Sequence, residues 1–246
     1  MRTELRIVAT NATLPEIHAS GGLSARRTGP HMVHLIGTAA TPLGGDQLDI
    51  TIAVGPGAEL VVRSVAATIA LPSVATPLSI GRWHFEIGSG GTLDIDPEPM
   101  IVAGGARHHT VTTIRLASDA RLRMRERIQI GRAGEDDGWW HGELIADLDA
   151  TPLLRHRLEL GAGTPADDAL AAPRALESEL VYPDKRPVAT TGLTQTRLPL
   201  AAGGSLFTRT GSLLAVPGDP EGIGVDPPLA PRSDGAPTFR SRPRES

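Results

Sequence analysis

Apolar and polar residues alternate along most of this chain, which is the pattern expected of β-strands with one buried face. The segment 48–54, LDITIAV, carries an apolar residue at every second position, and the side chains between them are small or polar. Similar alternation occurs at 83–87, 112–116, 144–148 and 154–160. The pattern therefore predicts an all-β protein with very few helices.

Short turns rich in glycine and small polar residues separate the predicted strands. Strand–turn–strand units follow one another, with turns at 55–57 (GPG), 88–91 (GSGG), 117–120 (ASDA), 149–152 (DATP) and 201–205 (AAGGS). Glycine supplies the positive φ that tight hairpin turns need. Stacked units of this kind predict two facing sheets, or a β-solenoid, with branched aliphatic residues between the layers. An ordinary β-sandwich is an alternative that periodicity does not separate from these.

Helix is expected at one place only. Thr164 is a good N-cap, Pro165 suits the first helical position, and two aspartates follow in the first turn. A proline ends this helix early, and we predict a strand for the next segment, 174–182 (RALESELVY). We therefore expect one β-rich domain over 1–216 and, from its high Pro and Arg content, a disordered tail over 217–246.

Composition narrows the classes of function. Aromatic residues make up only 3% of the 246 residues, so the core is expected to be aliphatic, and base-stacking platforms for nucleic acid are not expected. The net charge of −4 also argues against binding to nucleic acid or to an anionic membrane. Cysteine is absent, which excludes disulfides and thiolate metal sites. Because no signal-like or membrane-spanning apolar run occurs, we expect a soluble, cytoplasmic protein.

Histidine and tryptophan provide the first candidate site residues. His108 and His109 are adjacent, and in a strand their side chains would point to opposite faces and could not share one metal ion. We interpret them as solvated loop residues and as weak metal candidates. Trp139 and Trp140 lie in the segment GWWHGE, which we place in an exposed loop. They are candidates for partner contact, and a lid over one end of the core is the alternative.

Arginine occupies every second position from 121 to 127 in the segment RLRMRERIQI. In a strand, these side chains share one face and form a basic ridge about 20 Å long. We interpret this ridge as a solvated face. Its central members, Arg123 and Arg125, are the candidates for contact with an acidic partner.

Carboxylates are the more informative candidates. Glu126 interrupts the apolar row of the same segment, and a carboxylate in an apolar layer is costly unless it is paired or hydrogen-bonded. Arg132 is near enough in sequence to form a buried ion pair with it. The alternative is that Glu126 lines a polar channel between sheets. Asp46 follows two glycines, and its simplest interpretation is a turn residue that bonds its own backbone.

Three segments, taken together and in order, resemble the urease accessory protein family UreD, also called UreH. They are TPLGGDQLDITIAVGPGAELVVRSVAAT (41–68), PEPMIVAGGARHHTVTTIRLASDARLRMRERIQIGR (97–132) and PLLRHRLELG (152–161). The similarity extends over roughly 42–216. Asp46 lies in the segment that matches the Gly-rich turn of the family. Glu126 and Arg132 match the Glu and the Gly-Arg that the family places at the end of the later strand.

The resemblance implies a fold of stacked β-sheets and a role without catalysis in urease maturation. A member of the family is expected to bind apo-urease and UreF and, through UreF, the GTPase UreG. The resemblance implies no intrinsic cofactor but nickel in transit through an internal polar tunnel, for which Asp46, Glu126 and Arg132 are the candidate residues. The alternative is a metal-binding β-fold enzyme of the cupin type, although the His-x-His motif of such folds is absent.

Overall fold

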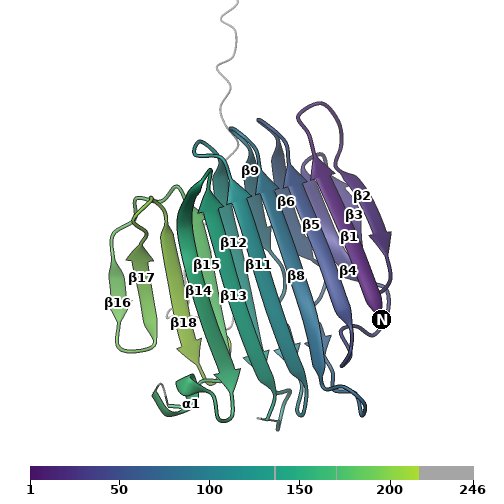
Figure 1. Ribbon diagram of the computed structural model, residues 1–246, viewed down its shortest axis with the longest axis vertical. Helices are drawn as coiled ribbons and strands as arrows, with labels where there is room; N and C mark the ends of the chain where they lie inside the picture. The colour runs from purple at the N-terminus through teal and green to yellow at the C-terminus, as the bar shows by residue number, and fades with distance from the viewer. Residues whose placement is uncertain (136, 170, 216–246) are drawn as a thin grey trace, which may run out of the picture.

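The computed structural model describes residues 1–135, 137–169 and 171–215. The tail predicted over 217–246 lies outside these residues. Within them the chain forms two large β-sheets that face each other (Figure 1). The all-β prediction is therefore confirmed.

The two sheets, A and B, form the layers of the fold. Within the described residues, sheet A has seven strands, in the order β14 (Thr151–Gly161), β13 (Trp139–Leu148), β11 (Arg107–Leu116), β8 (Leu78–Ile87), β5 (Gln47–Val54), β1 (Arg2–Ala9) and β2 (Glu16–Ser20). Sheet B has eleven, nine of them in the order β16 (Ala189–Thr191), β17 (Gln195–Pro199), β18 (Ser205–Gly211), β15 (Ala175–Tyr182), β12 (Arg121–Ile130), β9 (Thr92–Asp96), β6 (Glu59–Ser64), β4 (Met32–Gly37) and β3 (Leu23–Gly29). The other two are β7 (Thr68–Ala70), which pairs with β10, and β10 (Met100–Val102), which also pairs with β12.

The chain winds between the sheets as a β-solenoid of about four turns. It passes from β5 in sheet A to β6 in sheet B, returns to β8, and repeats this path through β9, β11, β12 and β13. Each strand of sheet A in this series lies parallel to the one from the previous turn. The solenoid prediction is confirmed, because an ordinary β-sandwich would place sequential antiparallel strands side by side.

The predicted turns are of two kinds. The first three connect strands of opposite sheets, so they are corners of the solenoid and not hairpins. Gly57, in the first of them, has a φ of +67°, which a residue with a side chain rarely adopts. The turns at 149–152 and 201–205 join antiparallel neighbours, β13 with β14 and β17 with β18, and these two are hairpins.

The helix and strand predicted at the end of the solenoid are both present. Helix α1 spans Pro165–Ala169, and the hydroxyl of Thr164 donates a hydrogen bond to the carbonyl of Gly161. Strand β15 covers the segment predicted as a strand. It pairs with β12 on one side and β18 on the other, so it links the solenoid to the antiparallel end of sheet B.

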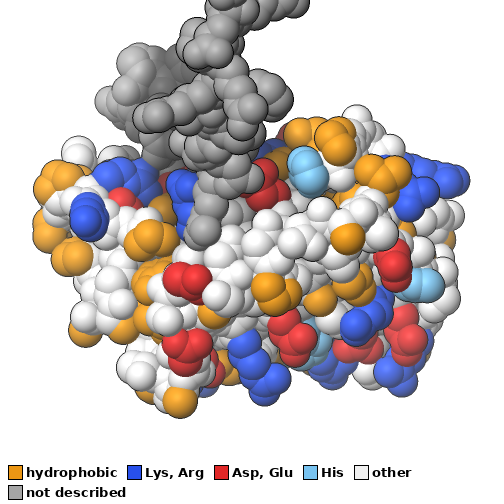
Figure 2. All heavy atoms as spheres, turned by 90° about the horizontal axis from the view of Figure 1, so that it is seen from above, with side chains coloured by type: hydrophobic (Ala, Val, Ile, Leu, Met, Phe, Trp, Pro, Cys, Tyr) orange, Lys and Arg blue, Asp and Glu red, His pale blue; other side chains and the backbone are white. Residues whose placement is uncertain are grey.

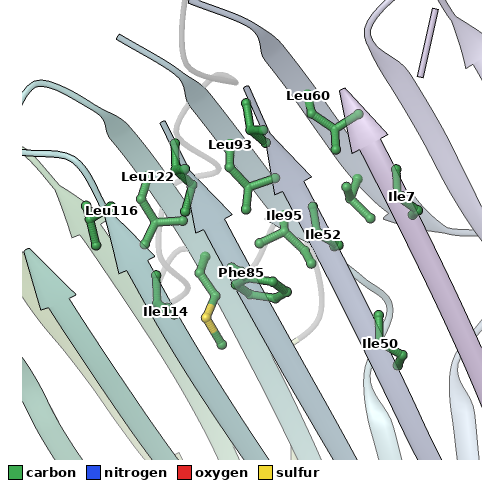
Figure 3. Close-up of a cluster of buried hydrophobic side chains, with 14 of the residues drawn as sticks. Ile7, Ile50, Ile52, Leu60, Phe85, Leu93, Ile95, Ile114, Leu116 and Leu122 are labelled. Atoms are coloured by element: carbon green, nitrogen blue, oxygen red, sulfur yellow. The ribbon is translucent and has the colours of Figure 1, made fainter. Parts of the chain in front are cut away.

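Aliphatic side chains from both sheets fill the space between the layers, as Figure 3 shows for one region. The buried core is divided into two clusters. The first cluster is the larger and includes Ile52, Phe85 and Ile114 from sheet A and Leu93 and Leu122 from sheet B. The second cluster includes Ile128, Ile130, Trp140, Leu160 and Leu176.

Candidate functional site

A cavity of about 460 Å³ lies between the two sheets. Its walls are largely apolar, with Ile50 and Phe85 on the side of sheet A and Ile95 on the side of sheet B. Polar side chains enter it from both layers. Thr110 and two other polar residues of β11 line it from sheet A, and Glu126 of β12 lines it from sheet B.

Glu126 is, with the exposed Glu98, one of the two acidic residues that line this cavity in the described part of the chain. It lies on the inward face of β12, between Met124 of the first cluster and Ile128 of the second cluster. Burial raises the pKa of its carboxyl to about 7. Among the described residues, no ion pair or hydrogen bond to its carboxylate is present to offset this cost. Of the two interpretations of Glu126, the position agrees with a polar group that lines a space between the sheets.

A row of polar side chains extends from Glu126 across sheet B. Glu126 is opposite Ser178 in the pairing of β12 with β15, and Ser178 is opposite Thr208 in the pairing of β15 with β18. Directly opposed residues share one face of a sheet and lie about 5 Å apart. We call Glu126, Ser178 and Thr208 the polar row. Apolar rows flank it on both sides, through the pairs Met124–Leu180 and Ile128–Leu176.

The polar row therefore separates the two hydrophobic clusters on the side of sheet B. On sheet A, the inward face of β11 carries three polar residues, His108, Thr110 and Thr112. They also lie between the two clusters, with Ala106 of the second cluster on one side and Ile114 of the first on the other. In Figure 1, β18 lies beyond β14, the edge strand of sheet A. The polar row thus runs from Glu126 at the cavity across β15 to β18.

Arg132 does not pair with Glu126, so the predicted buried ion pair is wrong. Arg132 lies in the turn after β12, with about half of its side chain exposed, and it pairs with Glu135. This contact and a hydrogen bond from Gly104 N–H lower the pKa of Glu135 to about 2. The turn beginning at Gly131, which has a φ of +77°, directs the chain away from the inward face on which Glu126 lies.

Asp46 is buried in the turn before β5, as its simplest interpretation predicts. Its carboxylate accepts hydrogen bonds from the backbone N–H of Leu43 and the hydroxyl of Thr41, and it pairs with the α-ammonium group of Met1. Burial alone would raise the pKa of Asp46, but these three partners outweigh it and the pKa is lowered. Thr41 lines the cavity, so Asp46 fixes part of the cavity rim.

The arginines of β12 share one face, as predicted, but they are not a solvated ridge. Arg123 is 4% exposed and Arg125 is 6% exposed. Arg123 contacts Glu179 at 3.1 Å, and Arg125 contacts the same carboxylate at 3.4 Å. These residues belong to an outer ion-pair network on the face of sheet B that points away from the cavity: Arg63, Asp94, Asp96, Arg123, Arg125, Arg127, Glu177, Glu179, Asp184 and Arg186.

This network corrects the interpretation of Arg123 and Arg125 as surface contacts for an acidic partner. Their guanidinium groups are buried and paired with carboxylates of this same chain. Charged side chains do occur on the surface: the face in Figure 2 shows acidic and basic groups interspersed, without a field of one sign. The network is therefore a structural element of sheet B.

His108 and His109 lie in β11 and not in a solvated loop, so that part of the prediction is wrong. Their side chains point to opposite faces, as expected in a strand. His108 is buried at the cavity, with Nδ1 2.8 Å from the hydroxyl of Ser79. Burial, and to a lesser degree the nearby His109, lowers the pKa of His108 to about 4, so its ring is neutral at physiological pH. His109 is on the outer face, where its ring stacks on His141 of β13.

Trp139 and Trp140 begin strand β13, so the exposed-loop interpretation is wrong for both. Trp140 is 1% exposed, belongs to the second cluster, and donates a hydrogen bond from Nε1 to Thr110 Oγ1 at 3.1 Å. It fills one end of the core, in agreement with the lid alternative. Trp139 is partly exposed on the outer face, and the guanidinium of Arg107 lies 4.4 Å from its ring centroid.

These features define a β-solenoid with a cavity and a row of polar side chains between its two sheets. The sequence matches the family model for the UreD urease accessory protein over residues 4–197. The chain is 40% identical over 190 residues to urease accessory protein UreD 1 of Saccharopolyspora erythraea, which covers 76% of this chain and 74% of that protein. It is 37% identical over 241 residues to urease accessory protein UreD of Frankia alni, covering 82% and 81%. It is 41% identical over 197 residues to the UreD protein of a Parafrankia species, covering 69% and 66%.

The chain therefore belongs to the UreD family of urease accessory proteins. Its role lies in the maturation of urease and is not catalytic, which decides against the cupin-type enzyme alternative. The family is linked to the nickel centre of urease and associates with urease and its accessory proteins. No helix in the described part of the chain has the length and hydropathy to span a lipid bilayer.

Proposed function

We propose that this chain is a cytoplasmic scaffold that binds apo-urease, recruits UreF and, through UreF, the GTPase UreG, and conducts nickel through its interior. Membership of the UreD family supports the scaffold role and the choice of partners. The internal route is an inference about particular residues of this chain, and it has its own structural support.

The polar row is the observation that carries the internal route. A fold whose layers are held together by aliphatic packing gains nothing in stability from an unpaired carboxylate between them. Glu126 is nevertheless placed there, opposite Ser178 on the next strand and next to a cavity of about 460 Å³. Because the carboxylate of Glu126 has no ion-pair or hydrogen-bond partner in the described part of the chain, it is free to bind a divalent cation, which would offset the cost of its burial.

The donors around the cavity suit a nickel ion in passage. Glu126 offers carboxylate oxygens, Thr110 and Thr112 offer hydroxyl groups, and His108 offers a neutral imidazole. Imidazole and carboxylate ligands both suit divalent nickel. Few ligands from one chain give weak, successive binding, which is what release to a partner requires. In this scheme Asp46 supports the rim of the cavity through Thr41, and Arg132 has no part in the route.

Co-purification from cells that express the urease operon tests the scaffold role. We expect UreF and apo-urease to be captured with this chain, and UreG to be captured only when UreF is present. Trp139 is the partner-contact candidate that remains at the surface, so Trp139→Ala is the informative variant and Glu86→Gln, an exposed carboxylate of β8, is its control. A chain that captures neither UreF nor urease during nickel-replete expression would contradict the proposal.

A further inference from the structure

Three potential metal ligands meet on the outer face of sheet A, on the opposite side of this sheet from the cavity. His109 of β11 and His141 of β13 are direct neighbours in the parallel pairing of these strands. Glu143 is two residues beyond His141 and therefore shares its face. From the alternation of the strands, all three side chains are expected to face solvent. His141 is nevertheless only 9% exposed.

The ligand atoms are close to the spacing that one metal ion imposes. His141 Nε2 is 3.3 Å from Glu143 Oε1, and His109 Nε2 is 3.8 Å from the same oxygen. One ligand atom from each of the three residues lies within 4.8 Å of the other two. Two ligands bound at about 2.1 Å with tetrahedral geometry are about 3.4 Å apart. Small side-chain rotations therefore bring the three groups into the first coordination sphere of one ion.

Both Nε2 atoms lack a hydrogen-bond partner in the described part of the chain. The Nε2 atoms of His109 and His141 are inaccessible to solvent, and their contacts with Glu143 do not have hydrogen-bond geometry. Their rings are stacked with centroids 4.4 Å apart, and both nitrogens lie within 4 Å of the same oxygen of Glu143. Buried nitrogen atoms without a partner are rare in folded proteins. An ion bound between the rings and Glu143 would satisfy both.

The surroundings of the group are those of a supported metal site. Glu159 of β14 lies on the other side of His141, with Oε1 3.9 Å from Nδ1, so a small rotation would let this carboxylate accept a hydrogen bond from the ring and direct the opposite nitrogen toward an ion. Arg157 is also near, but it donates a hydrogen bond to Glu159 at 2.8 Å and so is neutralised. Trp139 packs edge-on against His141 and shields one side of the group.

We propose that His109, His141 and Glu143 form a binding site for a divalent transition-metal ion of the Zn²⁺ or Ni²⁺ type. Two imidazoles and one carboxylate leave a fourth position for water or for a donor from another molecule. This donor set favours Zn²⁺, Ni²⁺ and Cu²⁺ over Mg²⁺ and Ca²⁺, which prefer oxygen ligands throughout. The site does not depend on the internal route, because its residues lie outside the space between the sheets.

Metal titration of the tag-free, chelator-stripped full-length chain tests this site, with Zn²⁺, Ni²⁺ and Mg²⁺ each competing against a chromophoric chelator. We expect one Zn²⁺ ion per chain and binding of Mg²⁺ at least about 100-fold weaker. His109→Gln, His141→Gln and Glu143→Gln should each weaken Zn²⁺ binding at least about 100-fold. Glu159→Gln should weaken it about 10- to 100-fold.

Two control variants locate the effect. His84→Gln removes an exposed histidine from the same face of sheet A, and Glu86→Gln removes an exposed carboxylate from that face. Both should leave Zn²⁺ binding at this site unchanged, and circular dichroism should show that every variant is folded. Equal Zn²⁺ affinity in wild type and in the His109→Gln/His141→Gln double variant would overturn the proposal. So would an anomalous-scattering peak at the zinc edge that lies away from these three residues.

Discussion

Arg123 and Glu179 form a buried ion pair between β12 and β15, with Arg123 Nε 3.1 Å from Glu179 Oε2. Glu179 is fully buried, and the same carboxylate also contacts Arg125 and Arg186. A single carboxylate thus holds three guanidinium groups on the outer face of sheet B. Removing its charge would leave the buried guanidinium groups of Arg123 and Arg125 with fewer carboxylate partners.

Glu179→Gln is therefore expected to destabilise the fold strongly. Breaking a buried ion pair by removing one partner costs about 3–5 kcal/mol, because the remaining charge stays desolvated. The matched control is Glu86→Gln, which removes the exposed partner of the exposed Arg115 and should cost less than about 1 kcal/mol. Urea denaturation at pH 7 measures both free energies of unfolding. Equal values for the two variants would contradict the role given to the outer ion-pair network.

Trp140 and Gly142 form a second pair whose sizes must match. A Cβ atom at Gly142 would lie 2.2 Å from Trp140 Cη2, so Gly142→Ala is expected to cost at least about 1–3 kcal/mol through overpacking. Trp140→Ala leaves a cavity and should cost about 3–5 kcal/mol. Gly142→Ala should be much less harmful when Trp140 is replaced by Leu, because the ring that it meets is gone.

Trp139 is the control for Trp140. Because Trp139 lies partly exposed on the outer face, Trp139→Ala should lower the free energy of unfolding far less than Trp140→Ala. Urea denaturation of both variants and a double-mutant cycle for residues 140 and 142 give the comparison. An additive cycle would show that the close approach of Gly142 to the ring is not what constrains this position.

Glu126 makes stability depend on pH in a defined direction. The pKa of Glu126 is about 7 in the folded chain and close to the usual value for a glutamate, 4.5, in the unfolded chain, so the folded state holds the proton more tightly between these values. Stability is therefore expected to fall as pH rises from about 4.5 to above 7, by about 1–3 kcal/mol from this one group. Glu126→Gln removes this dependence.

The measurement is urea denaturation of metal-free protein at pH 5 and pH 8. Glu126→Gln should match wild type at pH 5 and should be the more stable of the two at pH 8. A variant that is less stable than wild type at pH 8 would mean that the Glu126 carboxylate is stabilised by a partner in the folded chain.

Alternation along the chain predicted the central strands of the solenoid but gave no prediction for the strands before residue 48, and it did not show how the strands pair. The segment 48–64 has the same period whether its two strands form a hairpin or, as found for β5 and β6, lie in opposite sheets. Both arrangements bury every second side chain, and the Gly-Pro-Gly turn suits both. The last two turns, which are true hairpins, carry no feature in the sequence that sets them apart from the first three.

The arginine face shows what alternation omits. Alternation correctly placed Arg123, Arg125 and Arg127 on one side of a strand. The side chains that bury this side belong to other segments of the chain, which alternation within one strand does not show. In β15, Glu177 and Glu179 alternate with the same period and are opposite Arg127 and Arg125. This complementary pattern of charge was present in the sequence and would have identified the pairing of the two strands.

Glu126 was the residue that the sequence identified best, since a lone carboxylate in an apolar row required an explanation. Its proposed partner Arg132 was wrong because the turn after β12 carries the chain out of the core. Ser178 and His141 were missed for a different reason. Each becomes informative only beside a residue of another strand, Glu126 for the former and His109 for the latter, and such neighbours follow from the pairing of the sheets.

Nickel loading of urease by a chain that carries Glu126→Gln tests the central claim most directly. The variant and wild type are each co-expressed with the urease operon, and nickel content and activity are measured in purified urease, with Glu86→Gln as control. We predict that Glu126→Gln captures UreF and apo-urease as well as wild type does but leaves urease with several-fold less nickel and activity. Urease loaded to the wild-type level by the folded Glu126→Gln variant would contradict an internal route for nickel through this residue.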